Sequence, residues 1–119
     1  MAFDPASLTY DSAGLIPAIA QDEASGEVLM MAWMNAASVA ETLETGHVTY
    51  WSRSRKALWR KGESSGHLQS LVEMRVDCDR DCILVLVRQE GPACHTNRRS
   101  CFYTSVTPGG EREILKPMV

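Results

Sequence analysis

The sequence has no apolar run that approaches the roughly 20 residues of a membrane-spanning helix. Its first ten residues include Asp4 and Pro5 and lack the apolar core of a secretory signal. We therefore expect a cytoplasmic protein with no membrane partner, whose cysteines are reduced thiols. The net charge of −3 shows no excess of positive charge, so no nucleic-acid partner is expected either.

Internal repeats, linkers and CxxC pairs are also missing from the sequence. A length of 119 residues without a linker predicts one domain that spans residues 1–119. The absence of CxxC argues against a thiol-redox protein. The hydrophobic content of 45% is typical of a globular chain, and only the tail from about residue 108, which contains Gly109 and Gly110, is expected to be loose.

Short segments of alternating or β-branched residues predict an α+β, β-rich fold. Strands are expected over 15–20, 28–33, 48–51, 68–76 and 83–88. The first two would form a hairpin around a turn at 23–27. One helix is expected over 36–44, with Asn35 as its N-cap and Gly46 at its C-terminal end.

Aspartates alternate with other residues in Asp77-Cys78-Asp79-Arg80-Asp81. In an extended strand the three carboxylates would share one face, and Cys78 would point to the other. Carboxylates this close repel each other unless a cation neutralises them, and oxygen ligands favour Mg²⁺ or Ca²⁺. A solvated, Asp-rich loop is the alternative for this motif taken alone. An EF-hand is excluded, because its sixth and twelfth positions would be Cys82 and Arg88 instead of glycine and glutamate.

The four cysteines, Cys78, Cys82, Cys94 and Cys101, suggest a zinc site. All four could form a closed Cys₄ site in a non-catalytic interaction module. In an extended strand, however, the Cα atoms of Cys78 and Cys82 would lie about 13 Å apart, too far to hold one tetrahedral ion. A helix or tight turn would let them share it. Because residues 82–87 are strongly β-like, we favour three thiolates and one open coordination position.

Residues 52–67 are rich in basic, hydroxyl and glycine residues, as in Ser52-Arg53-Ser54-Arg55. Such a composition suits a loop that binds an anion. A plain surface loop is equally compatible with it, because the spacing of a P-loop is absent.

A series of short motifs occurs in order between residues 14 and 103. They are Gly14-Leu15-Ile16-Pro17-Ala18-Ile19, Ala32-Trp33-Met34-Asn35, Tyr50-Trp51-Ser52-Arg53-Ser54-Arg55, Lys61-Gly62-Glu63-Ser64-Ser65-Gly66, the aspartate run 77–81, and Ala93-Cys94-His95-Thr96 with Arg98-Arg99-Ser100-Cys101-Phe102-Tyr103. In these motifs the chain resembles the phosphoribosyl-AMP cyclohydrolase family of histidine biosynthesis. Asn97 departs from the family's usual glycine, and asparagine is the residue best able to replace glycine at positive φ. Cys82 lies outside the family's metal pattern, so we interpret it as a core thiol.

The resemblance implies an intertwined homodimer whose subunit is a compact, mixed, strongly curved sheet with one or two helices. It implies zinc held by Cys78 of one subunit and by Cys94 and Cys101 of the other, and Mg²⁺ on Asp77, Asp79 and Asp81. The implied substrate is a small-molecule nucleotide, AMP with a second phosphoribosyl group on N1. The implied reaction is zinc-dependent hydrolysis of the N1–C6 bond, in which an activated water attacks C6 and the adenine ring opens to an imidazole carboxamide.

Three thiolates would make zinc a weak Lewis acid, so the attacking water should need a general base. His95, which follows the ligand Cys94, is the candidate, and a histidine that only packs near the metal is the alternative. The base and two phosphates of the substrate require aromatic, cationic and hydroxyl side chains. The candidates are Trp33 (with Trp51 or Trp59 as alternatives for stacking), Ser52, Arg53, Ser54, Arg55, Lys61, Glu63, Ser64, Ser65, His67, Arg98 and Arg99.

Overall fold

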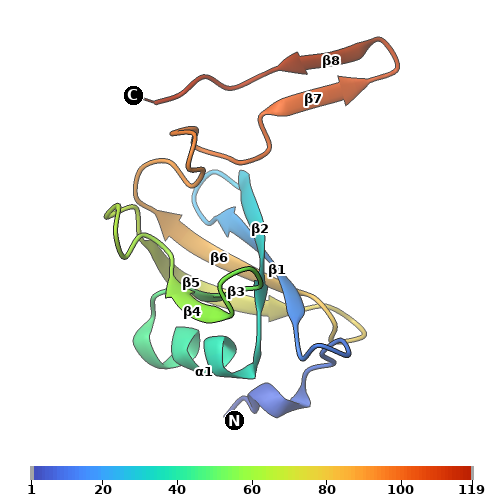
Figure 1. Cartoon of the computed structure of the whole chain (residues 1–119), viewed down its shortest axis with the longest axis vertical. Coiled ribbons are helices and arrows are strands. Elements are labelled where there is room, and N and C mark those ends of the chain that lie inside the picture. The colour runs from blue at the N-terminus through green and yellow to red at the C-terminus, as the bar shows by residue number, and fades with distance from the viewer. Residues whose placement is uncertain (1, 119) are drawn as a thin grey trace.

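Six strands form one mixed, curled sheet in the computed structural model, which describes residues 2–118 (Figure 1). The strands are β1 (Ile16–Asp22), β2 (Val28–Met34), β3 (Thr49–Ser52), β4 (Ala57–Arg60), β5 (Gln69–Val76) and β6 (Ile83–Gln89). Their order in the sheet is β4-β3-β2-β1-β6-β5. Only β1 and β6 pair in parallel, and the other neighbours are antiparallel. The prediction of a mixed, curved, β-rich sheet is confirmed.

The one α-helix of residues 2–118, α1 (Ala36–Thr45), begins and ends where the local sequence predicts. The Asn35 side chain accepts a hydrogen bond from the Ser38 amide, and the Ser38 hydroxyl accepts one from the Asn35 amide, so two free helix donors are satisfied. Gly46 ends the helix with φ of 76°, a conformation that glycine adopts without steric cost. A short 3₁₀ helix, η1 (Pro5–Ser7), precedes the sheet.

The core lies between α1 and one face of the sheet (Figure 1). Alternate residues of β6, Ile83, Val85 and Val87, are buried, which is the period-2 pattern of a strand with one covered face. At the centre of this core the buried Tyr50 hydroxyl donates to the side chain of Gln69 at 2.7 Å. Gln69 in turn donates to Gln89 at 2.9 Å, so the end of β6 is hydrogen-bonded into the core.

Two strands outside this sheet, β7 (Thr104–Thr107) and β8 (Gly110–Glu113), form a hairpin that projects from the body of the molecule (Figure 1). The hairpin begins before residue 108 and extends into the segment for which we predicted a loose tail. We did not predict β7, β8 or β4. The strand β4 lies inside the basic stretch that we interpreted as a loop, and it forms by pairing with β3, Trp51 opposite Leu58. In residues 2–118, no helix has both the length and the apolar character needed to cross a membrane.

Candidate functional site

The aspartate run forms a turn between β5 and β6, so the prediction of an extended strand at 77–81 was wrong. One carboxylate oxygen of Asp77 accepts hydrogen bonds from the amides of Asp81 at 3.0 Å and Cys82 at 3.2 Å. Arg80 has φ of 64°, which no strand allows. Asp side chains often bind nearby backbone amides in this way, and here that local bonding prevails over extension.

The three carboxylates nevertheless lie close together. The turn brings their side chains to one place, although it does so by a different geometry from the alternation of a strand. Ligand oxygens of Asp77, Asp79 and Asp81 all lie within 4.8 Å of one another, on exposed side chains. Hydrogen bonding with Asp79 and the nearby negative charges raise the pKa of Asp81 to about 6. A cation bound here would relieve the same repulsion, so the donor set fits Mg²⁺ or Ca²⁺.

The loop from Ala93 to Cys101 brings two thiols together. The Cys94 amide donates to the carbonyl of Arg98 and the Asn97 amide donates to the carbonyl of Cys94, so the loop turns back on itself. Asn97 has φ of 66°, which confirms the prediction that asparagine stands here in a conformation suited to glycine. Cys94 is buried and Cys101 is exposed, and the two thiols lie close enough that each affects the pKa of the other.

The surroundings of the two thiols favour ionisation of Cys94 before Cys101. Burial works against the Cys94 thiolate, but hydrogen bonds from Thr96, including Oγ1 to Sγ at 3.0 Å, lower its pKa. Desolvation and the adjacent Cys94 raise the pKa of Cys101 to about 11. Lys61 lies beside both, where burial lowers its pKa and the two cysteines partly oppose that effect. A buried thiol with a lowered pKa next to a cation is the setting of a reactive or metal-binding cysteine.

A cavity of about 290 Å³ opens beside Cys94. Its walls are Lys61, Ser65, His67, Pro92, Ala93, Cys94, His95 and Asn97. His95 is exposed, and His67 is half-buried with its ring packed on Gly91, where an added Cβ would lie 2.9 Å from the ring. The structure therefore places both histidines in the same cavity as one thiol.

Cys78 lies at the other end of β6 from this cavity. The strand β6 covers seven residues, so its ends are about 20 Å apart. Cys82 is half-buried beside the aspartate turn, also at the far end. Among residues 2–118, only the aspartates form a group of three or more side chains with ligand atoms close enough for one ion. Within a single chain, neither the three-thiol set nor the Cys₄ set is assembled.

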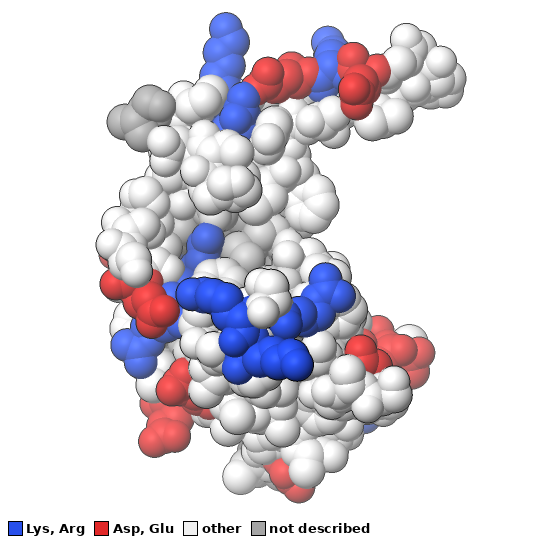
Figure 2. Space-filling model, in the orientation of Figure 1, with Lys and Arg blue, Asp and Glu red and all other residues white. Residues whose placement is uncertain are grey.

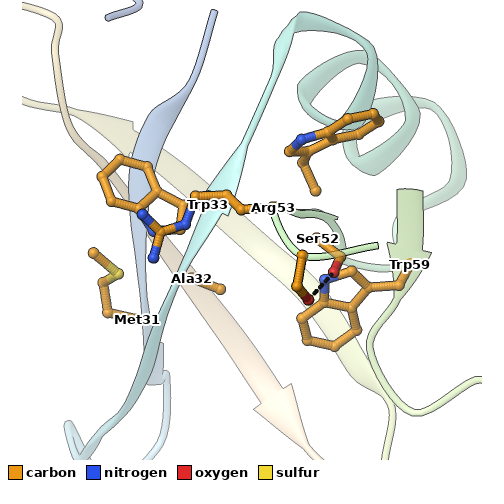
Figure 3. A pocket seen from close by; sticks show the side chains of 8 residues that line it. Met31, Ala32, Trp33, Ser52, Arg53 and Trp59 are labelled. Atoms are coloured by element: carbon orange, nitrogen blue, oxygen red, sulfur yellow. Dashed lines mark hydrogen bonds between the residues drawn. The ribbon is translucent and has the colours of Figure 1, made fainter. Parts of the chain in front are cut away.

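A second, open cavity of about 730 Å³ lies at the ends of β2 and β3 (Figure 3). It is lined by Met31, Ala32, Trp33, Trp51, Ser52, Arg53, Ser54 and Trp59. The Arg53 guanidinium lies over the Trp33 indole, 4.8 Å from the ring centroid, and the hydroxyls of Ser52 and Ser54 are 3.4 Å apart. In the same region, over β3 and β4, Lys and Arg side chains gather on the surface (Figure 2). An aromatic face beside cations and hydroxyls can bind both a base and a phosphate.

The remaining predicted substrate residues divide into two groups. Arg55, Glu63, Ser64 and Ser65 are exposed on turns. Arg98 and Arg99 instead contact the protein itself. The Arg98 guanidinium lies 4.0 Å from the Tyr103 ring centroid, donates to the Leu115 carbonyl at 3.0 Å and pairs with Glu113.

Two residues that support the thiol loop, Thr96 and Asp22, were not predicted from the sequence. Thr96 lies two residues after Cys94 in the chain, so its hydroxyl was a detectable signal. Asp22 pairs with Arg99 across 77 residues, and nothing local in the sequence indicates that contact.

Comparison with known proteins agrees with the motifs. Residues 30–103 match the family model described as Phosphoribosyl-AMP cyclohydrolase. The chain is 77% identical to the phosphoribosyl-AMP cyclohydrolase of Dinoroseobacter shibae and 72% identical to that of Ruegeria pomeroyi, in each case over the full length of both chains. A relative from Cereibacter sphaeroides with the same name is 74% identical, again over all of both chains. The resemblance inferred from the motifs is therefore confirmed: the chain belongs to the phosphoribosyl-AMP cyclohydrolase family.

Proposed function

We propose that this protein opens the adenine ring of phosphoribosyl-AMP by zinc-dependent hydrolysis of the N1–C6 bond, as a step of histidine biosynthesis. One observation carries the proposal beyond family membership: the 93–101 loop places the Cys94 thiol, which has Cys101 as a neighbour, in the wall of a cavity that His67 and His95 also line. Thiolate and imidazole donors suit zinc, so the residues present fit the metal.

Cys94 and Cys101 would supply two zinc ligands, and Cys78 of the partner subunit would supply the third in a homodimer. The length of β6 supports this assignment, because Cys78 of the same chain precedes one end of a strand about 20 Å long and Cys94 follows the other end. Zinc bound with one open position would activate water as a Lewis acid.

His95 would accept the proton of the attacking water. It lies in the chain directly after Cys94 and is exposed in the cavity that Cys94 also lines, where an imidazole could accept a proton. His67 lines the same cavity and would contact the substrate or replace His95 as the base.

Mg²⁺ would bind the aspartate turn and neutralise a substrate phosphate. A smaller cavity, lined by Thr9, Tyr10, Asp11, Leu15, Pro17, Trp33 and Asp81, connects this turn to Trp33. Trp33 also lines the cavity that contains Arg53, so one aromatic wall borders both regions. We assign base stacking to Trp33, and phosphate binding to Arg53, Arg55 and the hydroxyls of Ser52 and Ser54.

The proposal is tested by following ring opening of authentic phosphoribosyl-AMP by absorbance, with and without a zinc chelator. We expect turnover by zinc-loaded protein, its loss on chelation, and recovery when zinc is restored. Titration of native thiols in the same preparation should find Cys82 free. No turnover by fully zinc-loaded protein would overturn the proposal, and the absence of any free thiol would indicate the Cys₄ module instead.

A further inference from the structure

Arg99 lies in the chain between the two thiols, but its guanidinium points into the protein. Nη1 donates to the carbonyls of Gln89 and Gly91, each at 2.8 Å. Nη2 donates to a carboxylate oxygen of Asp22 at 2.9 Å. The side chain is 28% exposed, and its Nε lies 3.9 Å from the carboxylate of Glu27. With two carboxylates as neighbours, this guanidinium is poorly placed to attract a phosphate.

Asp22, the last residue of β1, accepts three hydrogen bonds with its carboxylate. One of its oxygens accepts from Arg99, and the other accepts from both the amide and the hydroxyl of Ser25, each at 2.9 Å. The side chain is 9% exposed. Removing one member of such a pair leaves a buried charge without its partner, so the contact resists local rearrangement.

The residues that follow Arg99 join the loop to β2. Ser100 is buried and donates from its hydroxyl to the carbonyl of Val28 at 2.7 Å. The Cys101 amide donates to the carbonyl of Leu29 at 2.7 Å. At the other end, the Ala93 amide donates to the carbonyl of Arg99, so Arg99 also closes the base of the loop. Its side chain links this base to β1, β6 and Gly91 through Asp22, Gln89 and the Gly91 carbonyl.

We propose that Arg99 is a positioning residue for the zinc ligands, and that the Asp22–Arg99 ion pair sets the separation and orientation of Cys94 and Cys101. The inference rests on the proposed zinc site. Outer contacts that orient ligands typically change metal affinity by about 10- to 100-fold when removed, because the ligands must then be ordered at the expense of binding energy.

The test uses the full-length protein and the variants Arg99→Met, Arg99→Lys and Asp22→Asn. Arg75→Met is the matched control, since Arg75 also pairs with a carboxylate, Glu73, at 2.9 Å, but on the exposed surface. Three measurements are made on each: zinc affinity by competition with a chromophoric chelator, the visible absorption of the Co²⁺-substituted protein, and the unfolding temperature of the metal-free protein.

We expect Arg99→Met to weaken zinc binding by about 10- to 100-fold and to alter the Co²⁺ spectrum. Arg99→Lys keeps the charge without the planar fork and should give a smaller loss, while Asp22→Asn should shift both measurements in the same direction as Arg99→Met. Arg75→Met should match wild type. If Arg99→Met lowers only the unfolding temperature and leaves zinc affinity and the Co²⁺ spectrum unchanged, the positioning role is overturned.

Zinc content of Cys94→Ala separates this failure from failure of the proposed function. If the proposed zinc site exists, Cys94→Ala must contain less zinc than wild type. If it does not, the zinc assignment is wrong and the positioning role falls with it. If Cys94→Ala loses zinc while Arg99→Met binds it normally, the positioning role alone is wrong.

Discussion

Lys61 donates a hydrogen bond from Nζ to the carbonyl of Ala93, the residue before Cys94, and this contact joins the end of β4 to the thiol loop. The ammonium group also lies 5.7 Å from the centroid of the Trp59 ring. Lys61 is therefore a half-buried cation directed at the two thiols, although its basic and glycine-rich surroundings in the sequence suggested a phosphate ligand.

Lys61→Met should weaken zinc binding, because it removes both a positive charge beside two thiolates and a donor to the loop backbone. We expect a loss of about 10-fold or more, measured by chelator competition. Lys61→Arg, which keeps the charge, is the matched variant and should retain most of the affinity. Equal zinc affinity in Lys61→Met and wild type would show that Lys61 serves the substrate instead.

His95→Ala should reduce kcat by roughly 10²- to 10⁴-fold, the range typical of general-base loss. Its zinc content should equal that of wild type, because His95 is not proposed as a ligand. Steady-state assays and metal analysis on the same preparation distinguish the outcomes. Loss of zinc would make His95 a ligand, whereas retention of both zinc and activity would transfer the role to His67, for which His67→Ala is the parallel variant.

Asp79→Asn should weaken Mg²⁺ binding by removing one of three convergent charges. The effect should appear in a Mg²⁺ titration, whereas zinc content should stay nearly constant because the substitution keeps all three proposed thiol ligands and changes only the carboxylate group. Glu44→Gln, which removes an exposed carboxylate at the end of α1, controls for the change in net charge. Parallel loss of zinc and magnesium would contradict the separation of the two sites.

Cys78→Ala and Cys94→Ala should each be inactive alone but regain partial activity when mixed and allowed to exchange subunits. The expectation follows from the length of β6, which separates Cys78 from Cys94 and Cys101 within one chain. A mixed dimer would contain one intact site out of two. Activity that stays absent after exchange has been demonstrated by mass labelling would argue that each site is built within one chain.

Acid should reduce the contribution of Asp22 to stability. Hydrogen bonds from Ser25, opposed by burial and assisted by Arg99, hold the pKa of Asp22 below its ordinary value. A carboxyl group whose pKa is lower in the folded state stabilises the protein above about pH 4 and loses that effect as the pH falls further. Urea unfolding should therefore show a larger difference between wild type and Asp22→Asn at pH 7 than at pH 3. Glu73→Gln, an exposed carboxylate, should show little difference at either pH.

Local chemistry determined the elements that the sequence predicted correctly. Asn35 and Ser38 satisfy the free amides of α1 within four residues, and Asn97 tolerates positive φ by itself, so neither depends on distant contacts. The alternation of Ile83, Val85 and Val87 likewise predicts a strand with one buried face whatever its partner. The same locality explains why the motifs sufficed to indicate the family.

Tertiary structure decided how these elements combine. The strand β4 forms by pairing with β3, and β6 lies parallel to β1 although about 60 residues of chain separate them. Both pairings depend on loop closure and burial and not on local strand propensity. The turn at 77–82 gathers the carboxylates because Asp77 binds the amides of Asp81 and Cys82. The Asp22–Arg99 contact spans 77 residues, and such an ion pair is stable only once the fold has excluded water from it. Sequence motifs identified the chemical groups, but their distances from one another follow from packing.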